Sequence, residues 1–269
     1  QSLPPYYNQI HTKRSTYSTA CINKIIAEKR MPFVNHDEFE RHVISQYPTE
    51  ACGIVRNNVF VPLKNIADNP LQDFKMDVMD YAREMALGVD AIVHSHPVNM
   101  KPCWYDQRIP SKADMMGQQK TALPWGIVTC EGETVSEPLW FGHKERPPLL
   151  EREFIFSVQD CLVLMSDYYL QTHGIIIPNT PRDVDWFLKS EDLITAGWEG
   201  FGFTPISMSE LRPGDVILMK IRSDFVNHIG VYIDHNKMLH HLINRLSGYD
   251  EINKWDKQIT ACIRHKDLT

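Results

Sequence analysis

The chain lacks any pair of cysteines in CxxC spacing, and it has only six cysteines in 269 residues. Neither a zinc knuckle nor an iron–sulfur site is therefore indicated by its cysteines. A disulfide framework is also not expected in a chain this long with so few of them. The six are Cys21, Cys52, Cys103, Cys130, Cys161 and Cys262. We expect most of them to be buried as small apolar side chains, and Cys161 is treated separately below.

Long apolar runs are absent as well. No stretch approaches the length needed to cross a bilayer, so we expect no transmembrane segment. The opening residues, QSLPPYYNQIHTKRSTYS, contain no apolar core like that of a signal peptide. If the protein acts outside the cytoplasm, we expect something other than a host secretion signal to carry it there.

Basic residues are fewer than acidic ones, with 28 Lys and Arg against 34 Asp and Glu, which gives a net charge of −6 at pH 7. Such a chain presents no broad positive field to attract phosphates, so we do not expect a nucleic-acid partner. Hydrophobic residues make up 43% and charged residues 23%, the composition of a globular protein. The length is sufficient for two compact domains.

Apolar residues alternate between helical and strand spacing along the chain, which predicts a mixed α/β protein of the α+β class. A helix is expected to begin at Asn35, with Glu38 completing a capping box. Arg56-Asn57 is the expected turn of the first hairpin. Further helices are expected over 77–87, 111–123 and 160–174, and strands over 51–55, 58–63, 91–96, 126–130, 228–233, 237–243 and within 211–221.

Charge and proline mark the boundary between two predicted domains. The stretch HKERPPLLERE combines charged residues with Pro147-Pro148, as is typical of a linker. The first 30 residues are polar and basic, and we expect them to order only against a partner, the alternative being a disordered leader. The predicted organisation is an arm over 1–30, a first domain over 31–142, a linker over 143–152 and a second domain over 153–269.

A first group of candidate site residues lies in the predicted first domain. His94 and His96 project from one face of a strand, and two adjacent imidazoles are natural zinc ligands. The helix that starts at Ser111 carries Asp114 in its first turn, where the carboxylate can be a third ligand. Zinc lowers the pKa of its bound water from ~16 to ~7, and Glu50 is placed to take the proton. Alternatively, the histidines only decorate the strand, and Ser111 and Asp114 only cap the helix.

The order of these residues carries a family resemblance. E-A-C-G, then H-S-H-P, then P-S-x-A-D resembles the JAMM (MPN-plus) metalloprotease family over about residues 31–142. The resemblance implies a Zn2+ cofactor bound by His94, His96 and Asp114, with Glu50 as general base and Ser111 helping to hold the oxyanion. The loop from Pro97 to Pro110 is longer than in that family. It can cover the metal, contact a neighbour through Trp104 and Tyr105, or supply Cys103 as an extra ligand.

A second group lies in the predicted second domain. Cys161 follows Asp160 at the start of an apolar helix, where the helix N-terminus favours the thiolate, although a buried helix cysteine is the usual alternative. Downstream, LRPGDVILM, NHIGVYI and KMLHHL resemble the papain-like NlpC-type peptidases over about residues 150–266. That resemblance implies a papain-like fold in which Cys161 is the nucleophile, His228 the base and His240 the residue that orients it.

The residue that orients His228 depends on the length of the predicted turn around Asp234-His235-Asn236, between the strands expected over 228–233 and 237–243. A three-residue turn places His240 opposite Gly230 and on the face of His228, whereas a two-residue turn gives that face to His241. Residue counting leaves both open. The family match favours His240, with His241 as a partner of a backbone group.

The two domains together resemble the tail-tip peptidases of lambda-like phages, in which a JAMM domain precedes an NlpC-type domain. The resemblance implies a virion tail-tip enzyme with other tail-tip or hub proteins as partners. It would hydrolyse peptidoglycan stem peptides, after D-glutamate, and so open the cell wall for genome ejection. The substrate of the zinc domain stays open. A structural tail-hub protein that keeps peptidase folds as scaffold is the alternative, and a bacterial autolysin would require a signal peptide or wall-binding repeats.

Overall fold

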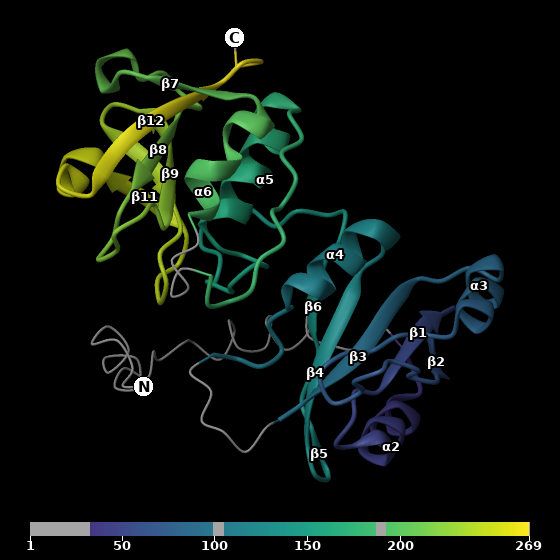
Figure 1. Cartoon of the computed structure of the whole chain (residues 1–269). Coiled ribbons are helices and arrows are strands. Elements are labelled where there is room, and N and C mark those ends of the chain that lie inside the picture. Colours follow the sequence, from purple (N-terminus) through teal and green to yellow (C-terminus); the bar gives the residue numbers. More distant parts are fainter. Residues whose placement is uncertain (1–32, 99–104, 187–191, 269) are drawn as a thin grey trace. The chain divides into compact units, whose positions relative to one another are not determined.

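The computed structural model describes residues 33–98, 105–186 and 192–268 (Figure 1). The predicted arm over 1–30, and Cys103 and Trp104 of the long loop, lie outside these residues. The described chain contains two six-stranded sheets, each at the centre of one compact unit. Helices accompany both sheets, so the predicted α+β class is confirmed. The domain boundaries named above stay predictions.

The first sheet has the strand order β2-β1-β3-β4-β5, with β6 paired to β4. Strands β3 and β4 pair in parallel, and α4 connects these two along the chain. A parallel pair requires such a crossover connection. The elements are β1 (Cys52–Arg56), β2 (Val59–Leu63), β3 (Ala91–Pro97), α4 (Lys112–Thr121), β4 (Trp125–Glu131), β5 (Thr134–Val135) and β6 (Leu139–Phe141).

The hairpin between β1 and β2 turns one residue later than predicted. Asn57 and Asn58 both have positive φ angles, 50° and 61°, and Arg56 pairs with Val59 across the hairpin. Two consecutive left-handed residues form the type I′ turn whose twist matches that of paired strands, and asparagine tolerates this conformation well. Arg56 is therefore the last residue of β1.

Asn35 precedes helix α2 (His36–Gln46) as predicted, but its side chain does not cap the helix. Its Oδ1 accepts the Phe60 backbone N–H at 2.7 Å, and its Nδ2 donates to the Phe60 carbonyl at 3.0 Å. An amide side chain can pair with a peptide group in both directions, which ties the helix start to β2. Phe39 and Val43 are buried on the sheet side, as their spacing predicts. Helix α3 (Val78–Ala86) begins after the capping residue Asp77.

The second sheet has the order β11-β10-β9-β8-β12-β7, and every neighbouring pair is antiparallel. The predicted hairpin near residues 234–236 joins β9 to β10. The strands are β7 (Phe203–Ile206), β8 (Val216–Met219), β9 (His228–Asp234), β10 (Lys237–His240), β11 (Gly248–Glu251) and β12 (Ile259–His265). The short helices are α6 (Leu193–Gly197) and the 3-10 turns η2 (Glu199–Phe201), η3 (Met208–Glu210) and η4 (Ile252–Trp255).

Helix α5 (Cys161–His173) packs against this sheet, and both of its ends follow from the sequence. Asp160 accepts the backbone N–H groups of Leu162 and Val163, each at 3.1 Å, and so caps the first turn. Gly174 ends the helix with a φ of 68°, a left-handed conformation that glycine adopts without strain. The core between helix and sheet includes Leu164, Tyr169, Phe203, Val216, Leu218, Ile229, Val231, Leu239 and Ile263.

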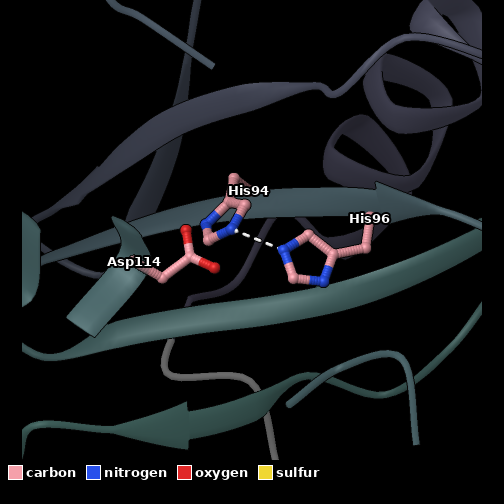
Figure 2. A group of neighbouring side chains, drawn as sticks. All are labelled: His94, His96 and Asp114. Atoms are coloured by element: carbon pink, nitrogen blue, oxygen red, sulfur yellow. Dashed lines mark hydrogen bonds between the residues drawn. The ribbon is translucent and has the colours of Figure 1, made fainter. Parts of the chain in front are cut away.

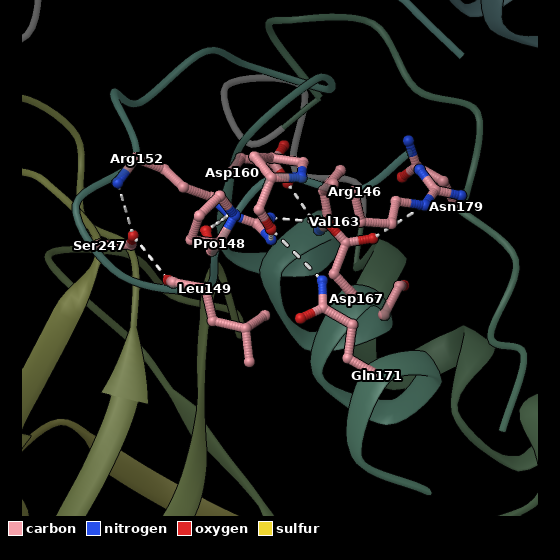
Figure 3. Close-up of polar contacts among 12 residues, drawn as sticks. Arg146, Pro148, Leu149, Arg152, Asp160, Val163, Asp167, Gln171, Asn179 and Ser247 are labelled. Atoms are coloured by element: carbon pink, nitrogen blue, oxygen red, sulfur yellow. Dashed lines mark hydrogen bonds and ion pairs between the residues drawn. The ribbon is translucent and has the colours of Figure 1, made fainter. Parts of the chain in front are cut away.

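Part of the predicted linker is fixed to the second unit (Figure 3). The buried Arg152 guanidinium pairs with Asp167 of α5 at 2.6 Å and donates to the carbonyls of Pro147 and Pro148. Ser247 accepts the Arg152 N–H and donates to a linker carbonyl. These bonds hold residues 147–152, here called the strap, against α5 and Ser247.

The cysteines and the helix lengths bear on two expectations drawn from the composition. The described cysteines, Cys52, Cys130, Cys161 and Cys262, are all buried free thiols, which confirms the expected burial for Cys52, Cys130 and Cys262. Within the described ranges, no helix combines the length and the apolar character needed to cross a membrane.

Candidate active site

The candidate nucleophile Cys161 is the first residue of α5 and is 9% exposed. The carboxylate of Asp160 beside it is held in place by a second buried ion pair. Its Oδ2 accepts the Ser157 backbone N–H at 2.8 Å and pairs with Arg182, whose side chain is 1% exposed. Arg182 also donates to Asn179 Oδ1 at 2.8 Å. These bonds fix the start of α5, and with it the position of the thiol.

The protonation of the thiol differs from the expectation. Burial raises the pKa of Cys161 to about 12, and the negative charge of Asp160 adds to this. The backbone N–H groups of Ile229 and Leu162 and the charge of Arg182 lower the pKa, but by less. Desolvation therefore outweighs the helix N-terminus, and the resting group is a neutral thiol. Such a thiol requires a base that removes its proton during the attack.

The candidate base His228 begins β9, immediately before the residue whose N–H faces the thiol. Its ring is buried, at 5% exposure, and burial lowers its pKa well below the usual range. The nearby rings of His240 and His241 lower it further. His228 is thus neutral and able to accept a proton. In the described structure no hydrogen bond joins its ring to the Cys161 thiol.

A β-bulge decides which histidine lies beside His228. The turn has two residues, His235 and Asn236, with φ angles of 44° and 62°, and Asp234 pairs with Lys237. By turn length alone, His241 would share the face of His228. The register then shifts by one residue between Lys237 and Met238, which skips Ile233 on β9. His240 consequently lies opposite Gly230, and its Nδ1 is 3.1 Å from the Nε2 of His228.

His241 lies on the opposite face of the strand. It is fully buried, with its ring 5.2 Å from that of Phe154 at an angle of 73°. Neither ring nitrogen makes a hydrogen bond of normal geometry. Burial is the main cause of its lowered pKa, while the backbone groups of Arg152 and Arg245 act in the opposite direction. The predicted backbone partner of His241 is therefore close by but not hydrogen-bonded.

The sequence reasoning missed Asp250 on β11. Its Oδ2 is 3.1 Å from the Nε2 of His240 and 3.1 Å from Nη1 of Arg245. Burial by itself would raise the pKa of Asp250, but the Arg245 guanidinium and the His240 ring outweigh it and hold that pKa below its usual range. The segment GYDE gives no clear strand signal, because it is short and has a single aromatic residue among polar ones.

The predicted metal ligands also come together (Figure 2). His94 and His96 project from one face of β3, and their Nε2 atoms are 3.1 Å apart. His94 is fully buried, with the rings of Phe74 and Trp125 at 4.5 Å and 5.7 Å. One ligand atom from each histidine and one from Asp114 lie within 4.8 Å of one another.

Ser111 and Asp114 form a capping box at the start of α4. The backbone N–H and the hydroxyl of Ser111 both donate to Asp114 Oδ2, at 2.8 Å and 2.7 Å. The capping alternative is therefore realised, and it is compatible with metal binding because it orients the carboxylate while Oδ1 receives neither of these two bonds. The Ser111 hydroxyl is engaged with Asp114, and its predicted oxyanion role stays a prediction.

Glu50 lies two residues before Cys52, which pairs with His94 in the β1–β3 register. Ala51 N–H donates to Ser95 Oγ and Ser95 N–H donates to the Ala51 carbonyl, both at 2.9 Å. These bonds tie the residue that follows Glu50 to the strand that carries the two histidines. The Glu50 residue is 5% exposed. Two of the three sequence motifs thus lie at neighbouring strands of one sheet, and the third begins α4, which connects β3 to β4.

Comparison with known proteins agrees with the geometry of the second unit. The NlpC/P60 family model matches residues 140–264, so the chain carries an NlpC/P60 domain, of the cysteine peptidase class. Tail tip assembly protein K of Escherichia phage N15 is 32% identical over 247 residues, covering 86% of this chain and 94% of that protein. The chain belongs to the family of tail tip assembly proteins K.

Two further similarities were found. Tail tip assembly protein K of Escherichia phage lambda is 32% identical over 186 residues, or 68% of this chain and 85% of that protein. The crystal structure of an NlpC/P60 family protein from Bacillus cereus ATCC 10987 is 14% identical, covers 84% of this chain and 66% of that chain, and has a TM-score of 0.32. The family assignment does not depend on the latter.

Proposed function

We propose that the protein is a phage tail-tip cysteine peptidase that hydrolyses the stem peptides of peptidoglycan, after D-glutamate, to help the tail penetrate the cell wall. The observation that carries this proposal is the arrangement around α5 and β9. A buried thiol lies at a helix start, and a neutral imidazole on the neighbouring strand is backed by a second imidazole. This is the arrangement that acyl transfer by a cysteine requires.

The residues would act in a fixed order. The Cys161 sulfur attacks the carbonyl carbon of the scissile peptide while His228 takes the thiol proton. His228 then gives that proton to the leaving amine as the carbon–nitrogen bond breaks, which leaves a thioester on Cys161. Water, deprotonated by His228, hydrolyses the thioester and releases the acid, and the thiol is regenerated. His240 holds the His228 ring through both steps.

The experiment is digestion of purified peptidoglycan by the full chain, with mass spectrometry of the soluble products. With EDTA and a reducing agent present, we expect soluble stem-peptide fragments whose new amino end is the residue that follows D-glutamate. A structural hub protein would release none. Release that iodoacetamide leaves intact and EDTA prevents would assign the activity to a metal site and contradict the proposal for Cys161.

We also propose a place in the virion. The relatives' name, tail tip assembly protein, supports a location at the tail tip with other tail-tip or hub proteins as partners. A hub protein that keeps its peptidase folds as scaffold would occupy the same place. One experiment distinguishes a peptidase from a scaffold protein. Particles that carry an inactive Cys161 variant should assemble in both cases, but they should eject their genomes poorly only if hydrolysis is the function.

A zinc peptidase site of the JAMM type is the second candidate function, favoured by the group of His94, His96 and Asp114. Two nitrogens bound to one tetrahedral zinc are about 3.3 Å apart, and the Nε2 atoms of the two histidines are separated by 3.1 Å. The Ser111 N–H donates to Asp114 Oδ2 and so orients the carboxylate, as hydrogen bonds from neighbouring groups orient the ligands of other metal sites. Zinc, when bound, would supply an activated water, and Glu50 would take and pass on its proton.

The zinc proposal predicts a loss of metal on replacing one ligand. His96→Asn should lower zinc from about one ion per chain to near zero after dialysis, because two remaining ligands bind zinc weakly. Glu50→Gln should keep the zinc, since Glu50 is proposed as a base and not a ligand. Metal content is measured by mass spectrometry of the dialysed protein.

The matched control is His235→Asn, which removes an exposed histidine from the second unit, 86% exposed at its side chain. It should retain zinc like the unmodified chain. Equal zinc content in the His96→Asn variant and the unmodified chain would rule out the assigned ligands, and zinc loss in Glu50→Gln would make Glu50 a ligand instead of a base.

A further inference from the structure

The polar groups behind His228 form a line that ends in a carboxylate. His228 Nε2 lies 3.1 Å from His240 Nδ1, and His240 Nε2 lies 3.1 Å from Asp250 Oδ2. Arg245 closes the line, because its guanidinium donates to both oxygens of Asp250, at 3.1 Å and 3.3 Å. The rings of Trp255 and His240 pack edge to face, with their centroids 5.3 Å apart.

Each bond in this line permits only one direction once the carboxylate is ionised. An ionised carboxylate can only accept, so the proton between Asp250 and His240 is carried by Nε2 of His240. A neutral imidazole has one N–H, so His240 Nδ1 is an acceptor. The proton between the two rings is then carried by Nε2 of His228. His228 Nδ1 is left as a bare nitrogen.

The charge states that this argument needs are supported by the surroundings. Burial lowers the pKa of His228 and is the largest cause of the lowered pKa of His240, so both rings are neutral near pH 7. The pKa of Asp250 stays below its usual range because the hydrogen bonds and charges of Arg245 and His240 outweigh the effect of burial. The line therefore holds one carboxylate charge, which Arg245 offsets.

We propose that Asp250 is a positioning residue that sets the tautomers of His240 and His228 and so leaves Nδ1 of His228 as the proton acceptor. The role of that nitrogen toward Cys161 rests on the proposed function, but the order of the tautomers does not. Without the carboxylate, the His240 proton is free to move to Nδ1. His228 Nε2 must then accept, so the proton of the His228 ring moves to Nδ1 and the base is lost.

The direct test is nitrogen-15 NMR of the full chain with labelled histidine, since the shifts distinguish a protonated ring nitrogen from a bare one. At neutral pH the unmodified chain should show protonated Nε2 and bare Nδ1 in both His228 and His240. A protonated Nδ1 on His228 would overturn the proposal. This readout needs no substrate, so it also decides the matter if the chain fails to cleave peptidoglycan or if an Asp250 variant fails to fold.

Replacing Asp250 tests whether its carboxylate sets the tautomers of His240 and His228. Asp250→Ala should redistribute both tautomers and lower kcat on peptidoglycan about 100-fold, because tautomer control by a carboxylate is worth up to ~10⁴-fold in serine peptidases and here acts across one more ring. Asp250→Glu keeps an ionised carboxylate, which can only accept, and should therefore keep the tautomers and lose less. Equal losses in the two variants, or unchanged tautomers in Asp250→Ala, would contradict the proposal.

The matched control is Glu251→Ala. Glu251 is the next residue of β11, and its exposed carboxylate pairs only loosely with Lys254, at 3.6 Å. The variant removes a negative charge of the same strand without touching the line of histidines. It should leave tautomers and kcat unchanged. A loss as large as that of Asp250→Ala would mean that the net charge of the strand, and not the bond to His240, is responsible.

Discussion

Replacing Cys161 by alanine should abolish the release of stem peptides from peptidoglycan, with a fall in kcat of roughly 10⁴-fold or more. The thiol forms the covalent bond of the thioester, and alanine has no atom that can do so. His228→Ala should cost about as much, and the double variant no more than either single one, because nucleophile and base act as a unit. Rates are measured from soluble peptide release, with EDTA present.

The control is Cys262→Ala, which removes another buried free thiol of the same unit. Cys262 lies on β12, and burial raises its pKa to about 11, so it is equally a neutral thiol. Its removal should leave kcat unchanged. Full activity of the Cys161→Ala variant under metal chelation would refute the assignment of the nucleophile.

Replacing Arg152 by alanine should destabilise the second unit by about 3–5 kcal/mol, the usual cost of removing one partner of a buried ion pair. The side chains of Arg152 and Asp167 are 2% and 4% exposed, so the remaining carboxylate would stay buried (Figure 3). The carbonyls of Pro147 and Pro148 would lose their bonds from the guanidinium as well, although Pro147 keeps the Gln171 amide as a donor at 3.3 Å. Amide hydrogen exchange along α5 measures this loss inside the unit concerned.

Arg146 provides the control, because it pairs with the same carboxylate from the surface. Its Nε lies 3.3 Å from Asp167 Oδ1, and its side chain is 41% exposed. Solvent screens such a pair, so Arg146→Ala should cost less than about 1 kcal/mol. Equal losses in the Arg146 and Arg152 variants would show that the buried guanidinium does not hold the strap to the helix.

Much of the fold could be predicted because local signals and tertiary packing agree. Asp160 and Gly174 mark the two ends of α5, and short-range hydrogen bonds and backbone preference are sufficient to place them. The spacing of His94 and His96 puts both rings on one strand face, whatever lies around the strand. Asn35 shows the limit of such signals, since a bond to β2, 25 residues away, replaces the expected cap.

The candidate cysteine site depends more on tertiary structure. Turn length predicts that His241 shares the face of His228, and only the bulge after Lys237 gives that face to His240. The position of a bulge depends on how both faces of the strand pack, and counting the residues between two strands does not predict that packing. Asp250 comes to the site because β11 pairs with β10, and a single carboxylate in a short polar segment gives no signal of that pairing.

Local sequence patterns are enough to predict which element carries each candidate site residue: a thiol at a helix start, a histidine at a strand start, and a histidine pair on one strand. The protonation state of these residues depends on how the chain folds. Burial makes Cys161 a neutral thiol although it begins a helix, and it keeps His228 unprotonated. The physical reason is that helix capping and strand alternation act between neighbours in the chain, whereas desolvation and hydrogen-bond direction depend on groups that folding brings from distant segments.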